Sequence, residues 1–105
     1  MASRLPYVLK NGVKFPRVVL GTSEMTLEEI PDVIEMAIRL GYRSINTAQM
    51  YNNEKEIGIA INRSSGKHCN REDIVLCSKI WPTHFKNVRE TVLEQLKKLD
   101  LEYID

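Results

Sequence analysis

The stretch GYRSINTAQMYNNEKEIG, residues 41–58, decides the predicted fold of this chain. Its first glycine supplies the stop of a helix, SINTA forms a short strand, and Tyr51 follows just beyond that strand's end. In parallel α/β proteins, functional groups collect at the carboxyl ends of strands. A second segment, LCSKIW at residues 76–81, repeats this arrangement with the amine of Lys79. A phenol and an amine brought together indicate proton transfer.

Composition and charge are those of an ordinary globular protein. The 105 residues predict one domain, with 43% hydrophobic and 28% charged residues. The net charge of +1 gives no electrostatic reason to expect nucleic acid or a membrane as a partner. Residues 1–12 contain no apolar core of signal-peptide length, and no apolar run is long enough to span a bilayer. We therefore expect a cytoplasmic protein.

The two cysteines, Cys69 and Cys77, lack metal-ligand spacing and have no accompanying histidine pair, so we expect no metal site. Two free thiols in a reducing compartment are the simplest interpretation. A disulfide between them stays open as an alternative, because two cysteines alone do not establish one.

The predicted elements are a hairpin followed by alternating strands and helices. Asn11-Gly12 favours a type I′ turn, and Thr26 with Glu29 resembles a capping box before the first helix. The full order is a hairpin at residues 7–16; a strand at 18–20 closed by Gly21; a helix burying Ile30, Val33, Ile34, Ala37 and Ile38; a strand at 44–48; a helix from Asn53 to Gly66; a strand at 74–80; a helix at 87–100 with Val88, Val92, Leu96 and Leu99 on one stripe; and the start of a fourth strand at 103–105. Such alternation predicts a parallel sheet with right-handed crossovers.

Side-chain alternation predicts which residues share a face of the sheet. If the larger aliphatic side chains pack under the helices, Asn46 and Lys79 lie together on the other face, near the carboxyl ends of their strands, with Tyr51 just beyond. Each residue also has a purely structural interpretation: a packing tyrosine, a lysine that reaches water and an asparagine that caps a turn. By the same reasoning Trp81 is a core residue and His84 a surface or turn residue.

The chain resembles the amino-terminal part of the aldo-keto reductase family. The matching pieces are LKNGVKFPRVVLGT (9–22), AIRLGYRSINTAQMYNNEKEIG (37–58), REDIVLCSKIWPTHF (71–85) and LKKLDLEYID (96–105), in the family's order. The resemblance implies an α/β fold: a partial TIM (β/α)₈ barrel with an N-terminal hairpin, three β-α units and the start of a fourth strand. Residues 1–105 would then be a truncated aldo-keto reductase domain.

The resemblance implies NADPH-dependent reduction of small-molecule aldehydes and ketones to alcohols. By correspondence with the family's motifs, Tyr51 is the proton donor and Lys79 is the lysine that favours its ionised form. Gly21 and Thr22, with Asn46, correspond to positions near the cofactor's nicotinamide side, and Trp81 to a wall of the substrate pocket.

The sequence departs from the family pattern in three ways. Asn46 stands where the family has an aspartate that pairs with the lysine, and Ser23 stands where a tryptophan is common. The family's orienting histidine would follow Asp105. We expect impaired catalysis from Asn46, because an amide forms a hydrogen bond with the amine without neutralising it.

Three hypotheses follow for function. The first is an NADPH-dependent carbonyl reductase represented by a partial chain. The alternative is a truncated, non-catalytic relative that acts as an interaction or regulatory protein or is a pseudogene-like product. A third is a subdomain that complements another fragment. For the 105-residue chain alone we expect inactivity and no tight NADP(H) binding. Open barrel edges predict that it is unstable, self-associated or dependent on a partner.

Overall fold

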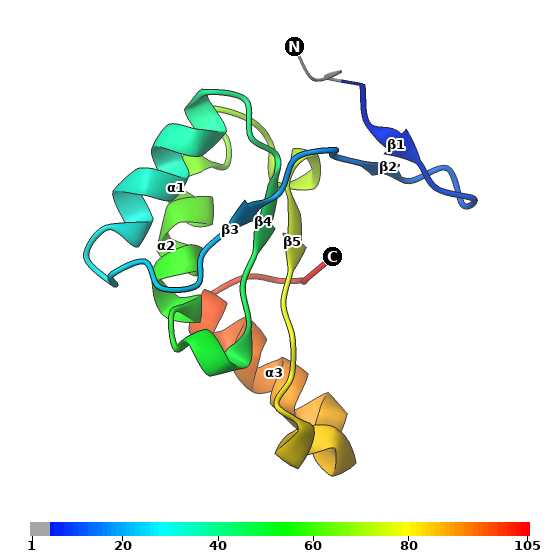
Figure 1. The fold of residues 1–105 in the computed structure, drawn as a ribbon, viewed down its shortest axis with the longest axis vertical. Helices are drawn as coiled ribbons and strands as arrows, with labels where there is room; N and C mark the ends of the chain where they lie inside the picture. The colour runs from blue at the N-terminus through cyan, green and yellow to red at the C-terminus, as the bar shows by residue number, and fades with distance from the viewer. Residues whose placement is uncertain (1–4) are drawn as a thin grey trace.

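A three-stranded parallel sheet lies at the centre of the computed structural model, which describes residues 5–105 (Figure 1). The strands β3 (Leu20–Gly21), β4 (Ser44–Asn46) and β5 (Val75–Cys77) lie side by side in chain order. Leu20 is level with Ile45, which is level with Leu76. One residue later, Gly21, Asn46 and Cys77 share a level, so all three strands present their carboxyl ends at one edge.

The remaining elements follow the predicted order. An antiparallel hairpin of β1 (Tyr7–Val8) and β2 (Lys14–Phe15) stands apart from the sheet, and α1 and α2 lie side by side along one flank of it (Figure 1). The helices are α1 (Ile30–Arg39), α2 (Glu54–Ser64) and α3 (Val88–Leu99), and three short 3₁₀ segments are η1 (Gln49–Tyr51), η2 (Arg71–Asp73) and η3 (Pro82–Asn87). An α/β chain with a parallel sheet is therefore confirmed.

The sheet and helices share one aliphatic core. Ile45 and Leu76 from the strands are fully buried against residues of all three helices. The other members of this cluster are Ile30, Ile34, Ile38, Ile57, Ala60, Ile61, Ile74 and Leu99. On the opposite face of the sheet, Asn46 and Cys77 are only half-buried. The larger aliphatic side chains thus pack under the helices, as the alternation predicts.

Two predicted helix faces are wrong in detail. Val33 is 39% exposed, because the buried stripe of α1 consists of Ile30, Ile34, Ala37 and Ile38. Val88 is likewise exposed, since α3 buries Thr91, Gln95 and Leu99 instead. The stripe of α3 is rotated because Gln95 forms hydrogen bonds with buried polar groups of α2 and the segment after β5.

The helix ends follow the predicted turn chemistry. Thr26 and Glu29 exchange the two hydrogen bonds of a capping box, one turn before α1 begins at Ile30. Gly41, at φ +108°, ends α1 with the two backbone bonds of a Schellman motif, from Gly41 to Ile38 and from Tyr42 to Ala37. The second helix ends at Ser64, two residues before the predicted Gly66.

The predicted strands are longer than those observed, and the fourth strand is not formed within residues 5–105. Residues 103–105 lie beside β5, where the Asp105 N–H donates to the Leu76 carbonyl (3.1 Å). The Asp105 carboxylate accepts the Leu76 N–H at 3.0 Å and pairs with Arg71 at 3.0 Å. A side chain thus occupies the edge position where a backbone carbonyl would continue a ladder.

The two cysteines are free thiols, as expected. Burial raises the pKa of Cys69. Among the described residues no cluster of three or more side chains is arranged to hold a metal ion. No helix in residues 5–105 is long and apolar enough to cross a membrane.

Candidate active site

Lys79, Asn46 and Tyr51 meet at the carboxyl edge of the sheet. The Lys79 ammonium donates to the Asn46 side-chain oxygen at 2.5 Å and to the Thr47 carbonyl at 3.0 Å. It also lies over the Tyr51 ring, 5.2 Å from the centroid. The structure therefore brings together the three polar residues that the strand alternation places on one side.

Backbone hydrogen bonds beyond the strand ends create this meeting point. The Thr47 N–H donates to the Cys77 carbonyl (2.8 Å), and the Gln49 N–H donates to the Lys79 carbonyl (2.9 Å). The two chains thus stay paired past β4 and β5 before η1 turns away. Tyr51 ends η1, and the left-handed conformation of Asn52 (φ +53°) directs the chain into α2.

The end of β3 completes the same edge. Thr22 is fully buried, and both its N–H and its hydroxyl donate to the Asn46 carbonyl, at 3.2 and 2.9 Å. Gly21 is exposed, and a Cβ atom at this position would have no heavy atom within 4 Å. Thr22 therefore fixes the strand end, while Gly21 leaves open space beside it.

Trp81 and His84 are both held by Gln49. The Gln49 side-chain oxygen accepts the Trp81 N–H at 3.0 Å and lies 3.2 Å from His84 Nδ1. The Trp81 side chain is 44% exposed, so it is not the core residue of the structural interpretation. Sequence reasoning missed Gln49, although its place between a strand end and Tyr51 was the available signal.

Two further residues that sequence reasoning missed are Asn53 and Glu54, at the start of α2. Asn53 is 2% exposed; its amide donates to the Thr22 carbonyl and hydroxyl, both at 3.1 Å, and its oxygen accepts the Thr47 hydroxyl at 2.5 Å. Glu54, the next residue, contacts α3 and the segment after β5, because its carboxylate accepts hydrogen bonds from Gln95 and Ser78. Burial raises the pKa of Glu54, and those two bonds oppose the rise.

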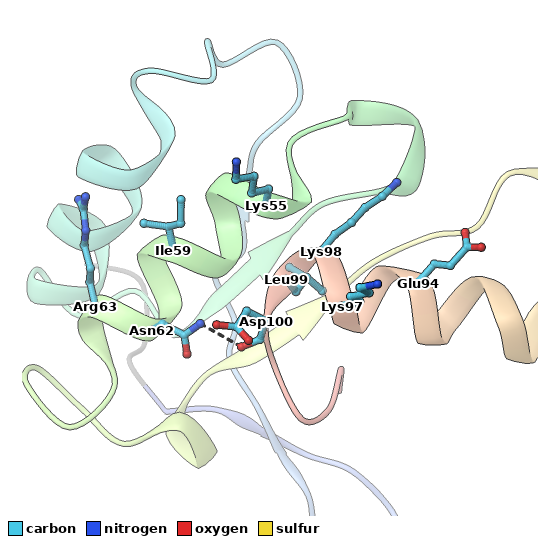
Figure 2. Close-up of a pocket in the computed structure, with 9 residues that line it drawn as sticks. All are labelled: Lys55, Ile59, Asn62, Arg63, Glu94, Lys97, Lys98, Leu99 and Asp100. Carbon is cyan, nitrogen blue, oxygen red and sulfur yellow. Dashed lines mark hydrogen bonds between the residues drawn. The ribbon is translucent and has the colours of Figure 1, made fainter.

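A hollow of about 960 Å³ lies elsewhere, between α2 and α3 (Figure 2). Its lining combines the apolar Ile59 and Leu99 with the charged Lys55, Arg63 and Lys98. Asn62 bridges the two helices there by donating to the Asp100 carbonyl at 3.0 Å (Figure 2). None of its lining residues belongs to the group around Lys79 and Tyr51, so it is not part of the candidate site.

Comparison with known proteins identifies the class. The model of the aldo/keto reductase family matches residues 17–105. The resemblance in the sequence is thus confirmed, and the chain belongs to the aldo/keto reductase family.

Individual relatives agree with this assignment. The chain is 39% identical over 105 residues to methylglyoxal reductase DkgA of Escherichia coli K12, covering the whole chain and 37% of the relative. It is 41% identical over 100 residues to the NAD(P)H-dependent D-xylose reductase of Kluyveromyces lactis, covering 92% of the chain and 30% of the relative. It therefore spans about a third of the length of these relatives.

A solved structure has the same fold over this region. The aldo-keto reductase of Bombyx mori, crystallised in complex with NADP, superposes with a TM-score of 0.88 at 32% identity. The match covers 99% of this chain and 37% of that protein.

Proposed function

We propose that this chain contributes the first strands of a (β/α)₈ barrel that reduces aldehydes and ketones to alcohols with NADPH. Family membership and the named activities of the relatives support this reaction class. The NADP complex of the Bombyx mori structure supports the cofactor. Within this chain, the main support for the proposal is the position of the Lys79 ammonium, which lies over the Tyr51 ring and donates a hydrogen bond to Asn46.

This arrangement fits proton donation by Tyr51. NADPH, when bound, supplies the hydride that forms the new C–H bond at the carbonyl carbon. The Tyr51 hydroxyl gives its proton to the carbonyl oxygen, which keeps the electron pair of the broken π bond. The neighbouring Lys79 cation stabilises the negative charge left on the phenol oxygen. Carbonyl, hydride and proton together give the alcohol.

Gly21, Thr22 and Asn46 are our proposed cofactor-facing positions. The open space beside Gly21 fits the approach of a flat ring, because no side chain intrudes there. The Thr22 hydroxyl is already bonded to the Asn46 carbonyl, so Thr22 contributes by holding Gly21 and Asn46 in register. Trp81, half-exposed and held through Gln49, is the proposed wall of the substrate pocket.

The reaction is tested in a completed barrel. Residues 1–105 are joined to the remainder of Escherichia coli DkgA, and NADPH oxidation is followed with methylglyoxal. Tyr51→Phe should lower kcat by about 100-fold or more, because it removes the proton donor. Tyr42→Phe is the matched control, since Tyr42 is a surface phenol on another loop. A completed barrel with unaltered kcat after Tyr51→Phe would refute the proposed role.

The 105-residue chain on its own is proposed to be inactive and to self-associate. The half-buried sheet face around Asn46 and Cys77 supports association, because none of the three helices in residues 5–105 packs on that face and a second molecule could cover it. Titration of Trp81 fluorescence with NADPH should show no saturable binding at micromolar cofactor, and gel filtration should show species larger than a monomer. A sharp monomer peak with cooperative unfolding would contradict the association.

A further inference from the structure

The buried carboxylate of Glu54 lies behind the strand end that carries Lys79. Glu54 is the first residue of α2 and is 3% exposed. Its Oε2 accepts the Ser78 hydroxyl and the Gln95 amide, each at 3.0 Å. Three elements that are far apart in the sequence therefore meet at one oxygen atom.

Gln95 links this oxygen to the backbone of Lys79. Its Nε2 atom lies 3.1 Å from the Ser78 hydroxyl and 3.3 Å from the Lys79 carbonyl. The same carbonyl accepts the Gln49 N–H, so the peptide that carries Lys79 is bonded on both sides. Gln95 is itself 3% exposed, and this burial excludes water as a competing partner.

Burial of this carboxylate is unfavourable for stability, because two well-placed donors only partly offset its desolvation. The first turn of α2 contributes a further favourable field for negative charge. The atoms that the carboxylate fixes, however, are those next to Lys79. Loss of the acceptor would leave the part-buried Ser78 hydroxyl without its acceptor, remove one bond from the Gln95 amide, and loosen the segment that aims the amine at Asn46 and Thr47.

We propose that Glu54, with Ser78 and Gln95, is a positioning cluster for the Lys79 amine. The contribution is made through hydrogen bonds and does not involve contact with substrate or cofactor. The role rests on the proposed function, which gives Lys79 its task. The cluster's effect on where the amine lies is a separate property that needs no catalysis to be measured.

The test is the reactivity of individual lysines in the completed barrel, in which residues 1–105 are joined to the remainder of Escherichia coli DkgA. A low dose of an acetylating N-hydroxysuccinimide ester labels free amines, and peptide mass spectrometry gives the rate at Lys79 relative to Lys67. Lys67 lies outside the cluster and pairs with Glu35, so this ratio cancels differences in dose and in overall folding. No cofactor or substrate is present, so failure of the reductase proposal leaves this measurement intact.

Glu54→Leu and Gln95→Leu should each raise the Lys79-to-Lys67 ratio about threefold or more, the change expected from losing roughly one net hydrogen bond. Glu54→Gln keeps an acceptor oxygen and should retain the wild-type ratio. Glu56→Gln and Glu94→Gln are matched controls on the same two helices and should change nothing. An unchanged ratio in both leucine variants, or equal acceleration of both lysines, would overturn the proposal and leave a purely structural role.

Discussion

The amine of Lys79 donates to the amide oxygen of Asn46 over 2.5 Å, and no carboxylate is among the hydrogen-bond partners that the structure gives this amine. The family pattern places an aspartate at the position of Asn46. Asn46→Asp should therefore restore an ion pair and raise kcat of the completed barrel by roughly tenfold, which corresponds to about 1.4 kcal/mol of transition-state stabilisation. Turnover of methylglyoxal at saturating NADPH measures this effect. Glu72→Gln, an exposed change on η2, is the control, and equal turnover in Asn46→Asp would refute the inferred impairment.

Gly58 allows α2 and α3 to approach each other closely. A Cβ atom at this position would lie 1.9 Å from the backbone oxygen of Leu99, which no side-chain rotation relieves. Gly58→Ala should lower the free energy of unfolding by about 1–3 kcal/mol or more, because the helices must separate. Urea denaturation of the completed barrel, followed by circular dichroism, measures this loss and the stability changes of the variants below. Gly21→Ala is the matched control, because its Cβ meets open space, and similar stability in the two variants would contradict this reading of the contact.

Asp100 ends α3 in a left-handed conformation at φ +54°, where glycine is ordinarily favoured. Its backbone N–H bonds back to Lys97, and that of Leu101 to Leu96, so the geometry is a Schellman motif. Asp100→Gly should stabilise the chain by about 0.5–1 kcal/mol, because it removes strain and a negative charge at a helix C-terminus. The Asn62 bond to the Asp100 carbonyl is preserved in this variant. Equal or lower urea midpoints would argue against strain at this position.

Glu35 is expected to make stability depend on pH in the acid range. His68 Nε2 at 3.1 Å and Lys67 Nζ at 3.2 Å hold the pKa of Glu35 below its ordinary value of 4.5, the His68 bond foremost. A depressed pKa stabilises the folded state fully above the unfolded value, and this contribution is lost as the pH falls through the folded value. Glu35→Gln should therefore be less stable than wild type near neutral pH, and the difference should shrink once the pH falls below 4.5. Urea midpoints across this range measure it, with the exposed Glu28→Gln as control. A difference that does not vary with pH would exclude titration of Glu35 as its cause.

The side-chain alternation of the strands correctly predicted that Asn46 and Lys79 lie on the same face of the sheet. Asn46 and Lys79 lie together as expected, because alternation depends on local backbone geometry and persists where a strand is shorter than predicted. The capping box of Thr26 and the helix stop at Gly41 are equally local, and the structure confirms both. These features need no knowledge of distant parts of the chain.

Features that depend on partners far away along the chain could not be predicted from the sequence. Hydropathy assigns Gln95 to the surface, but its partners Glu54 and Ser78 lie 41 and 17 residues away and make its burial favourable. This pairing rotates α3 and exposes Val88, which the apolar pattern had placed inside. Gln49 was missed for the same reason, because Trp81 and His84 lie 32 and 35 residues further along the chain.

The start of α2 also links the ends of the two outer strands of the sheet. Asn53 is bonded to Thr22 at the end of β3, and Glu54 is bonded to Ser78 beyond the end of β5. These two strands are not neighbours, since β4 lies between them. Two consecutive residues at the start of α2 therefore hold the two outer strand ends, in addition to the backbone ladders that join each of them to β4. A shift of α2 would strain the hydrogen bonds at both outer strand ends at once, so the start of this helix couples β3 to the segment after β5 as well as packing against the sheet.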